Sequence, residues 1–221
     1  MSLFIARFAL PRKRLYNNTM PIVFFNVEWM SFNSMLAFLA VLLGYFFLQA
    51  KPKALKIFFG LLWLVFLPNT IYLFTDLKHI LYQWNQVDMF EKSLILIQYM
   101  ILEFVGLVTF ILAFHPFEKM LEKFAPLKRK RVALLIAFNF LVAFGLVLGR
   151  VERINSWEIV TQPMHVLGAA WHILSSLDLV GLTILFGLFC NFVYFLFHES
   201  IMEDTKRVVR KLYVMTNNFL D

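Results

Sequence analysis

The sequence predicts an all-α polytopic transmembrane helical bundle, and three observations support this fold class. First, 61% of the 221 residues are hydrophobic and only 16% are charged, whereas a soluble globular domain carries roughly a quarter charged residues. Second, the chain contains five apolar runs that are long enough to cross a lipid bilayer. Third, backbone groups in lipid must be satisfied within their own segment, so each of these runs should be a helix.

The five expected spans cover residues 32–50, 54–74, 93–114, 132–149 and 177–198. At ~1.5 Å of rise per residue, about 20 residues cross a hydrocarbon layer of ~30 Å. We therefore expect a five-span domain over residues 32–198. An N-terminal segment over residues 1–31 should hold an interfacial helix or a partial span, because Glu28 argues against deep insertion. The tail over residues 199–221 mixes charged and apolar residues at helical spacing, which predicts an amphipathic helix on the membrane surface.

The distribution of lysine and arginine predicts the orientation of the spans. Thirteen of these residues lie on the side that includes the 115–131 loop and the C-terminus, and eight lie on the other side. The richer side should be cytoplasmic, which places segments 75–92 and 150–176 outside. We assign the net charge of +7 to loop orientation and to anionic lipids at the cytoplasmic face, not to nucleic acid.

A stripe of polar residues occupies the outer end of the second span, in "LPNTIYLFTDLKH". Its members are Asn69, Tyr72, Asp76 and His79. Spacings of 3, 4 and 3 residues place them on one face of a helix. Pro68 should interrupt the helix just before the stripe, because proline cannot donate the helical hydrogen bond. The stripe could bind or transform a ligand, or it could cap a following helix and sit at the headgroup level.

A second polar cluster, "GRVERINSWEIVTQP", follows the fourth span. Arg150 and Arg153 are three residues apart and could form a fork of donors for a carboxylate or phosphate. Their alternatives are an internal pairing with Asp76 or contact with outer headgroups. Asn155 and Glu158 have the spacing of a helix-capping pair. Capping accounts for the presence of these two residues as well as a catalytic role does.

Two polar residues, Glu103 and Asn139, should lie near mid-membrane. An ionisable residue at this depth suggests a function by default, such as passage of a proton or substrate. A protonated Glu103 could instead donate to Asn139 and join two helices. Gly145 and Gly149 have the small-residue spacing that permits close helix approach.

The histidines and the single cysteine indicate neither a metal site nor a cofactor. His165 and His172 share a face of an expected outer interfacial helix, but two histidines two turns apart do not make a strong zinc site. His115 and His198 stand at span ends, as boundary residues do. Cys190 lies inside an apolar run, so no disulfide framework is expected.

The two polar clusters together resemble the signature segments of a bacterial membrane-protein family catalogued as domain of unknown function 1361. The matching residues are Trp63, Leu67, Pro68, Asn69, Tyr72, Thr75, Asp76 and His79, then Gly149, Arg150, Arg153, Asn155, Ser156, Trp157, Thr161 and Pro163. The resemblance extends from about Asn33 onward, with Glu158 where the family usually has aspartate and with a first span that looks shortened. It implies a multi-pass protein of a bacterial plasma membrane whose two outer clusters form one shared feature, and it implies no activity.

Three functional hypotheses follow from these residues. The leading one is an outward-facing site that binds an anionic small molecule or lipid headgroup, for transport or envelope-lipid handling. Its residues would be Asn69, Tyr72, Asp76, His79, Arg150, Arg153, Asn155 and Glu158. The second is an enzyme acting on a lipid-linked substrate, with His79 as general base, Asp76 orienting it and Glu158 as a further candidate. The third is a structural subunit of a membrane complex in which Asp76 and an arginine clamp two helices; the sequence leaves its oligomeric state open.

Overall fold

The computed structural model describes residues 20–123 and 129–218, and these residues form helices joined by short connections. The helices are α2 (Met20–Gln49), α3 (Lys53–Phe66), α4 (Pro68–Tyr72), α5 (Lys78–Gln83), α6 (Met89–Lys123), α8 (Arg131–Arg150), α9 (Glu158–Thr161), α10 (Pro163–Ser175) and α11 (Leu177–Asn218), with 3₁₀ segments η1 (Leu73–Leu77) and η2 (Trp84–Gln86). The predicted all-α membrane bundle is confirmed. Most of the N-terminal segment lies outside the described residues.

Five helical segments are long and apolar enough to cross a membrane, as expected of a multi-pass membrane protein. They are Ile22–Gln49, Lys53–Gln86, Met89–Lys123, Arg131–Arg150 and Leu177–Arg210. Arg131–Arg150 agrees with its predicted span to within one residue at each end, and the other four extend well beyond the predicted spans. In particular, α2 includes residues 20–31, which we expected to form a separate interfacial or partial span, and α11 continues without interruption into the tail.

The hydrogen bonds of Asn26 explain why α2 begins before the apolar run that we expected to start at residue 32. Asn26 is fully buried and exchanges two hydrogen bonds with Gln83, at 2.9 and 2.8 Å. It also donates to the Gln98 side chain at 3.3 Å and accepts from the Trp29 indole at 3.1 Å. The amide of Asn26 is therefore satisfied by residues of α5 and α6, while Glu28 stays exposed on the outside of α2.

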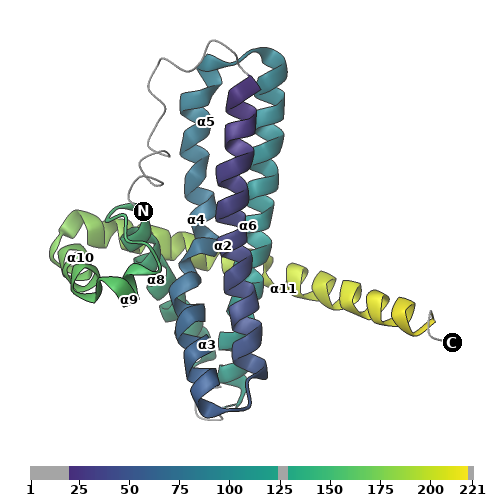
Figure 1. Cartoon of the computed structure of the whole chain (residues 1–221). Helices are drawn as coiled ribbons and strands as arrows, with labels where there is room; N and C mark the ends of the chain where they lie inside the picture. Colours follow the sequence, from purple (N-terminus) through teal and green to yellow (C-terminus); the bar gives the residue numbers. More distant parts are fainter. Residues whose placement is uncertain (1–19, 124–128, 219–221) are drawn as a thin grey trace.

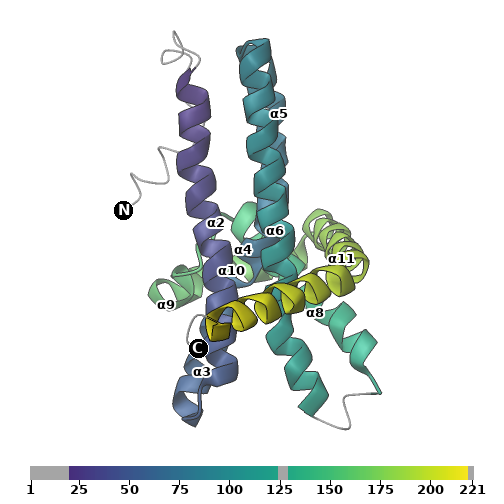
Figure 2. The same cartoon turned by 90° about the vertical axis from the view of Figure 1, so that its right-hand side faces the viewer.

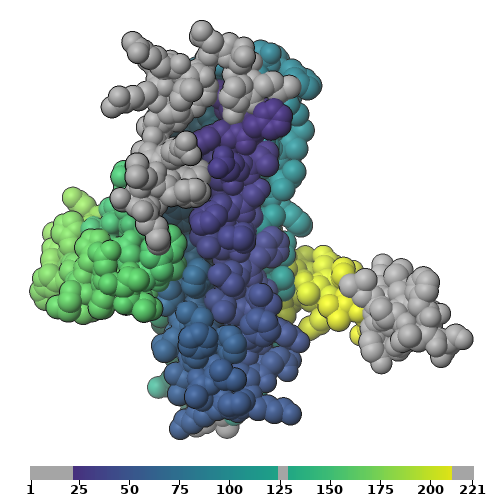
Figure 3. Space-filling model, in the orientation of Figure 1, coloured from purple at the N-terminus to yellow at the C-terminus, as the bar shows by residue number. Residues whose placement is uncertain are grey.

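The helices form two groups that cross each other. Figure 1 shows α2, the segment from α3 to α5, and α6 running alongside one another. We call these helices together the column, and Figure 2 shows it after a quarter turn. In both views α11 crosses this column, and it packs along α8. The short helices α9 and α10 form a block on one side of the column, while α11 leaves on the other, as the space-filling view also shows (Figure 3).

The second span is interrupted where the sequence predicts it. Helix α3 ends at Phe66, and α4 begins at Pro68. A Cβ atom added to Gly145 of α8 would lie 2.4 Å from Cγ of Pro68, so this crossing requires glycine at position 145. Beyond it, the span tightens into the 3₁₀ turn η1. The crossing brings the end of α8 against the polar stripe of the second span.

Candidate functional site

Arg150, the last residue of α8, joins the two polar clusters. Its Nη2 donates to Oδ1 of Asp76 and to the carbonyl oxygen of Thr75, both at 2.7 Å. Its Nη1 donates to the Tyr72 hydroxyl at 2.6 Å, and the guanidinium lies 4.5 Å from the centre of the Tyr72 ring. The internal partner suggested by the sequence is therefore the one that Arg150 contacts.

Asp76 is held from two sides. It is 1% exposed, and its second oxygen, Oδ2, accepts a hydrogen bond from the Asn33 side chain of α2 at 3.0 Å. His79 approaches less closely, with Nε2 3.9 Å from Oδ1 of Asp76 and its ring packed beside Trp29. Oδ1 of Asp76 already accepts a hydrogen bond from Arg150. The short contact of this carboxylate is therefore with Arg150, whereas the enzyme hypothesis requires a short contact with His79.

A second contact joins the clusters one turn earlier. The Asn69 amide donates to the Phe66 carbonyl at 2.9 Å and to the Ser156 hydroxyl at 3.2 Å. The Ser156 hydroxyl in turn donates to the Val65 carbonyl at 3.4 Å. The Asn69 side chain therefore donates to the carbonyl of Phe66, next to the proline interruption, and connects this part of the second span to the 151–157 segment.

Glu158 takes the role of a cap. Its Oε1 accepts from the backbone and side-chain nitrogens of Asn155, at 3.1 and 2.6 Å, and its Oε2 lies 3.2 Å from Nδ1 of His165. Partial burial raises the pKa of the Glu158 carboxyl, but hydrogen bonds from Asn155 and His165 outweigh burial, so the pKa lies below its usual 4.5. A similar contact joins His172 to Glu152 at 2.9 Å. These contacts hold α9 and α10 against the segment that precedes them.

Arg150 and Arg153 are not neighbours on one helix, which the fork suggested by their spacing assumed, although both act electrostatically on Tyr72 and Lys78. Helix α8 ends at Arg150, and Arg153 lies beyond it with a left-handed backbone φ of 57°. Its side chain is exposed and forms no ion pair within the described residues. Lys78 is also exposed and has no carboxylate within 4.0 Å among the described residues. It interacts electrostatically with Arg150 and Arg153, which repel it, and with Asp76, which attracts it.

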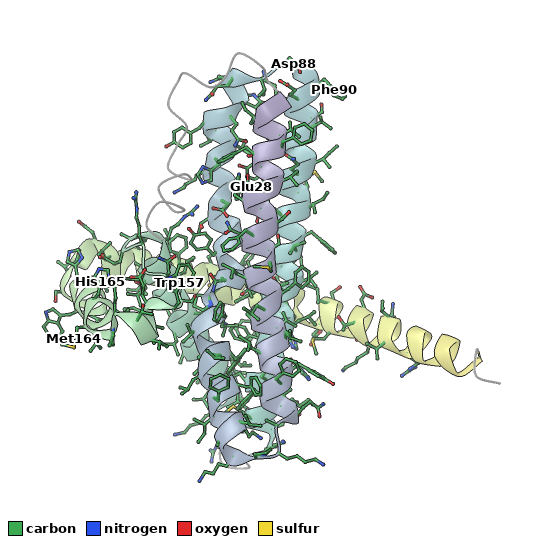
Figure 4. All side chains as sticks on the ribbon, in the orientation of Figure 1. Glu28, Asp88, Phe90, Trp157, Met164 and His165 are labelled. Atoms are coloured by element: carbon green, nitrogen blue, oxygen red, sulfur yellow. The ribbon has the colours of Figure 1, made fainter. Side chains whose placement is uncertain are left out.

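A cavity of about 430 Å³ lies beside these contacts, between α2, α4, α8 and the 151–157 segment. Its polar lining residues are Asn33, Asn69, Tyr72, Asn155 and Ser156, and the rest of its wall is predominantly apolar. Trp157 also lines it; Figure 4 shows Trp157 on the side of the α9–α10 block that faces the column, with Met164 and His165 farther out.

Comparison with known families decides the identity. A family model described as "Protein of unknown function (DUF1361)" matches residues 32–193, which is more than half of the chain. The chain belongs to the DUF1361 family. Comparisons with curated proteins and with solved structures found no match. The matched region includes both polar clusters, so the contacts that join one cluster to the other lie within it.

The two intramembrane polar residues of this DUF1361 protein do not meet. Asn139 donates to Asn191 of α11 at 3.1 Å, and Asn191 donates to the Gly187 carbonyl at 2.8 Å. The carboxyl oxygens of Glu103 are buried and have no hydrogen-bond partner within the described residues. The Glu103–Asn139 contact was one of two alternatives left open by the sequence; Asn139 instead joins α8 to α11, two helices that pack along each other.

A cluster around Glu118 of α6 was missed by sequence reasoning. Glu118 is 3% exposed and accepts a short hydrogen bond from the Tyr194 hydroxyl. His198 lies 2.8 Å from it, and His115 and Arg131 each lie 3.6 Å from it. We had treated both histidines as boundary residues. The only available signal was their position at span ends that the topology places on one side of the membrane.

No group of three or more His, Cys, Asp or Glu side chains in the described part of the chain is arranged to hold a metal ion. In the α9–α10 block, His165 and His172 each face a different carboxylate, Glu158 and Glu152. Each histidine therefore has a carboxylate partner of its own, and the two do not converge on one point.

Proposed function

We propose that this DUF1361 protein is a multi-pass protein of a bacterial plasma membrane that binds an anionic ligand, a small molecule or a lipid headgroup, at an outward-facing site. The proposal keeps the residues of the two polar clusters but changes their roles. Arg150 is neutralised by Asp76, so it organises the site. Lys78 and Arg153 supply the positive charge that a ligand would neutralise, because neither has an ion-pair partner within the described residues.

The backbone of Arg153 is the observation that carries this proposal. A non-glycine residue in the left-handed region is less stable than glycine by roughly 1–2 kcal/mol. Arg153 adopts a φ of 57° while its side chain is exposed and makes no ion pair within the described residues. The turn itself is structural, because the Ile154 amide next to Arg153 donates to the Leu148 carbonyl at 3.1 Å at the end of α8. Glycine or asparagine is the usual residue at such a left-handed position. An exposed arginine there is an outlier from which a functional role is inferred. The role that suits an exposed guanidinium is contact with an anion.

The charge distribution supports the orientation. The side richer in lysine and arginine, which includes the 115–131 loop and the tail, is assigned to the cytoplasm. Lys206, Arg207 and Arg210 of α11 would then meet anionic lipids of the inner leaflet. Lys78 and Arg153 would face outward, on the side that has the smaller number of basic residues.

The test is retention of an anionic lipid by the purified protein. The wild type and the variants Lys78→Gln, Arg153→Gly and Lys92→Gln are reconstituted in nanodiscs of phosphatidylcholine containing phosphatidylglycerol, and bound lipids are identified by native mass spectrometry. Loss of phosphatidylglycerol from Lys78→Gln and Arg153→Gly, but not from Lys92→Gln, supports the proposal. Lys92→Gln is the matched control because it removes one positive charge from the same side, where Lys92 lies over the Trp84 ring. Equal retention by all variants would contradict the proposal.

A second candidate function is structural. The short Asp76–Arg150 contact with its additional bonds to Tyr72 and Thr75 is what a clamp between the second and fourth spans requires. A protein that serves only as a rigid subunit would show the stability effects expected of this clamp and no dependence of lipid retention on Arg153.

A further inference from the structure

We propose that the cavity between α2, α4 and α8 holds one hydrocarbon chain of the ligand, so that the ligand is an anionic lipid and not a soluble anion. This inference rests on the proposed function, because it places the charged part of the same molecule at Lys78 and Arg153. It assigns a second binding surface that neither polar cluster contains by itself.

The cavity is polar at one end and apolar at the other. At the polar end, Asn69 and Ser156 are bonded to each other, and Tyr72 lies beside Gly149. Along α8 the wall continues inward through apolar residues as far as Phe138. This gradient fits a molecule whose polar part lies near the end of α8 and whose apolar part lies deeper in the membrane.

The length of the cavity along α8 is close to the thickness of one leaflet. Its α8 wall runs from Gly149 to Phe138, which at 1.5 Å per residue corresponds to about 16 Å. The hydrocarbon layer is ~30 Å thick, so one leaflet contributes about half of that. A volume of about 430 Å³ lies within the range of small-molecule pockets, roughly 300–1,000 Å³. The dimensions therefore fit one chain that enters from the outer leaflet.

The rim of the cavity faces hydrocarbon. Phe32 of α2, Leu64 of α3 and Leu141 of α8 line the cavity and are themselves 41%, 40% and 55% exposed. Exposed side chains of this kind on a membrane-spanning helix contact lipid. A chain can thus pass from the bilayer into the cavity without crossing water.

The charged groups lie next to the polar end. Arg153 immediately precedes Ile154, which lines the cavity, and Lys78 interacts electrostatically with Arg153. A phosphate attached to a chain in the cavity would therefore be placed near two cations that lack an ion-pair partner within the described residues. This complementarity selects an anionic lipid over a zwitterionic one.

The experiment fills the cavity without touching the cations. In Leu64→Trp an indole is placed at the cavity rim, whereas Leu61→Trp places the same group one turn earlier on α3, where Leu61 is 59% exposed and does not line the cavity. Leu36→Trp fills the cavity from α2 and serves as a second variant if Leu64→Trp does not fold. Thermal unfolding in detergent identifies the variants that fold.

The readout is native mass spectrometry of nanodiscs of phosphatidylcholine with phosphatidylglycerol, with soluble glycerol phosphate as a competitor. We expect a cavity-filling variant to retain at least about fivefold less phosphatidylglycerol than the wild type, Leu61→Trp to match the wild type, and glycerol phosphate to compete poorly, because a chain contributes binding free energy for each CH₂ it buries.

Two results would overturn the inference. If the cavity-filling variants retain phosphatidylglycerol as well as Leu61→Trp does, or if glycerol phosphate displaces the lipid at an equal concentration, the ligand is held by its charge alone. In both cases retention would still depend on Lys78 and Arg153, so the proposed function would survive. Loss of that dependence instead removes the proposed function, and with it the inference that rests on it.

Discussion

Removing Asp76 should destabilise the protein by about 3 kcal/mol or more. In Asp76→Ala the guanidinium of Arg150, which is 14% exposed, loses its carboxylate, and breaking a buried ion pair from one side costs about 3–5 kcal/mol. Asn33 also loses its acceptor. The remaining bonds from Arg150 to the Tyr72 hydroxyl and the Thr75 carbonyl keep the expected value near the lower end of that range.

The assay is unfolding in mixed detergent of wild type, Asp76→Ala, Arg150→Ala and the double variant. Because the two side chains are in contact, the double variant should cost less than the sum of the single ones, with a coupling free energy of about 2 kcal/mol. Exchanging the two charges should restore only part of the stability, because an aspartate at position 150 would face the Thr75 carbonyl. A coupling below about 0.5 kcal/mol, within the error of additivity, would refute the clamp.

Three further predictions concern the backbone and the α9–α10 block. Arg153→Gly should raise the free energy of unfolding by about 1 kcal/mol in the same assay, because glycine adopts the left-handed region freely, while lipid retention falls. Gly145→Ala should lower it by about 1–3 kcal/mol, because its Cβ would lie 2.4 Å from Cγ of Pro68; Gly168→Ala, where no heavy atom lies within 4 Å of the added Cβ, should instead stabilise α10 slightly. The pKa of Glu158 is lowered on folding, so its carboxylate stabilises the protein above the usual pKa of 4.5 and this contribution is lost as pH falls through the folded value. The difference in thermal midpoint between wild type and Glu158→Gln should therefore be largest near neutral pH and should shrink in acid; a difference that grows in acid would contradict the assigned hydrogen bonds.

The spans and the meeting of the two clusters were predictable because each depends on a strong local pattern. Runs of apolar residues set the length of the helices, and the spacing of Tyr72 and Asp76 places both side chains on the face that Arg150 reaches. The proline interruption also follows from a local rule, since Pro68 cannot donate a helical hydrogen bond. The contact between Asp76 and Arg150 therefore follows from local patterns, while the candidate site and its function stay proposals.

The errors arose where a residue's role depends on a neighbour that is distant in sequence or on the end of a helix. Asn139 pairs with Asn191 and not with Glu103, because α8 packs along α11 and nothing in the sequence identifies that neighbour. The spacing of Arg150 and Arg153 suggested a fork only on the assumption that the helix continues, but α8 ends at Arg150. Asn33, which completes the environment of Asp76, had no local signal, because nothing in the sequence distinguishes it from other polar residues of α2 such as Asn26 and Ser34.

The Glu118 cluster affects how the protein is made. The carboxylate belongs to α6, whereas Tyr194 and His198 belong to α11, the last helix of the described chain to leave the ribosome. Until α11 is inserted, a carboxylate that ends up buried lacks its closest partners, and this end of the bundle cannot close. Completion of the fold at Glu118 therefore requires the insertion of α11, and a chain that stops before it presents membrane quality control with an acidic group that has only its two more distant partners, His115 and Arg131.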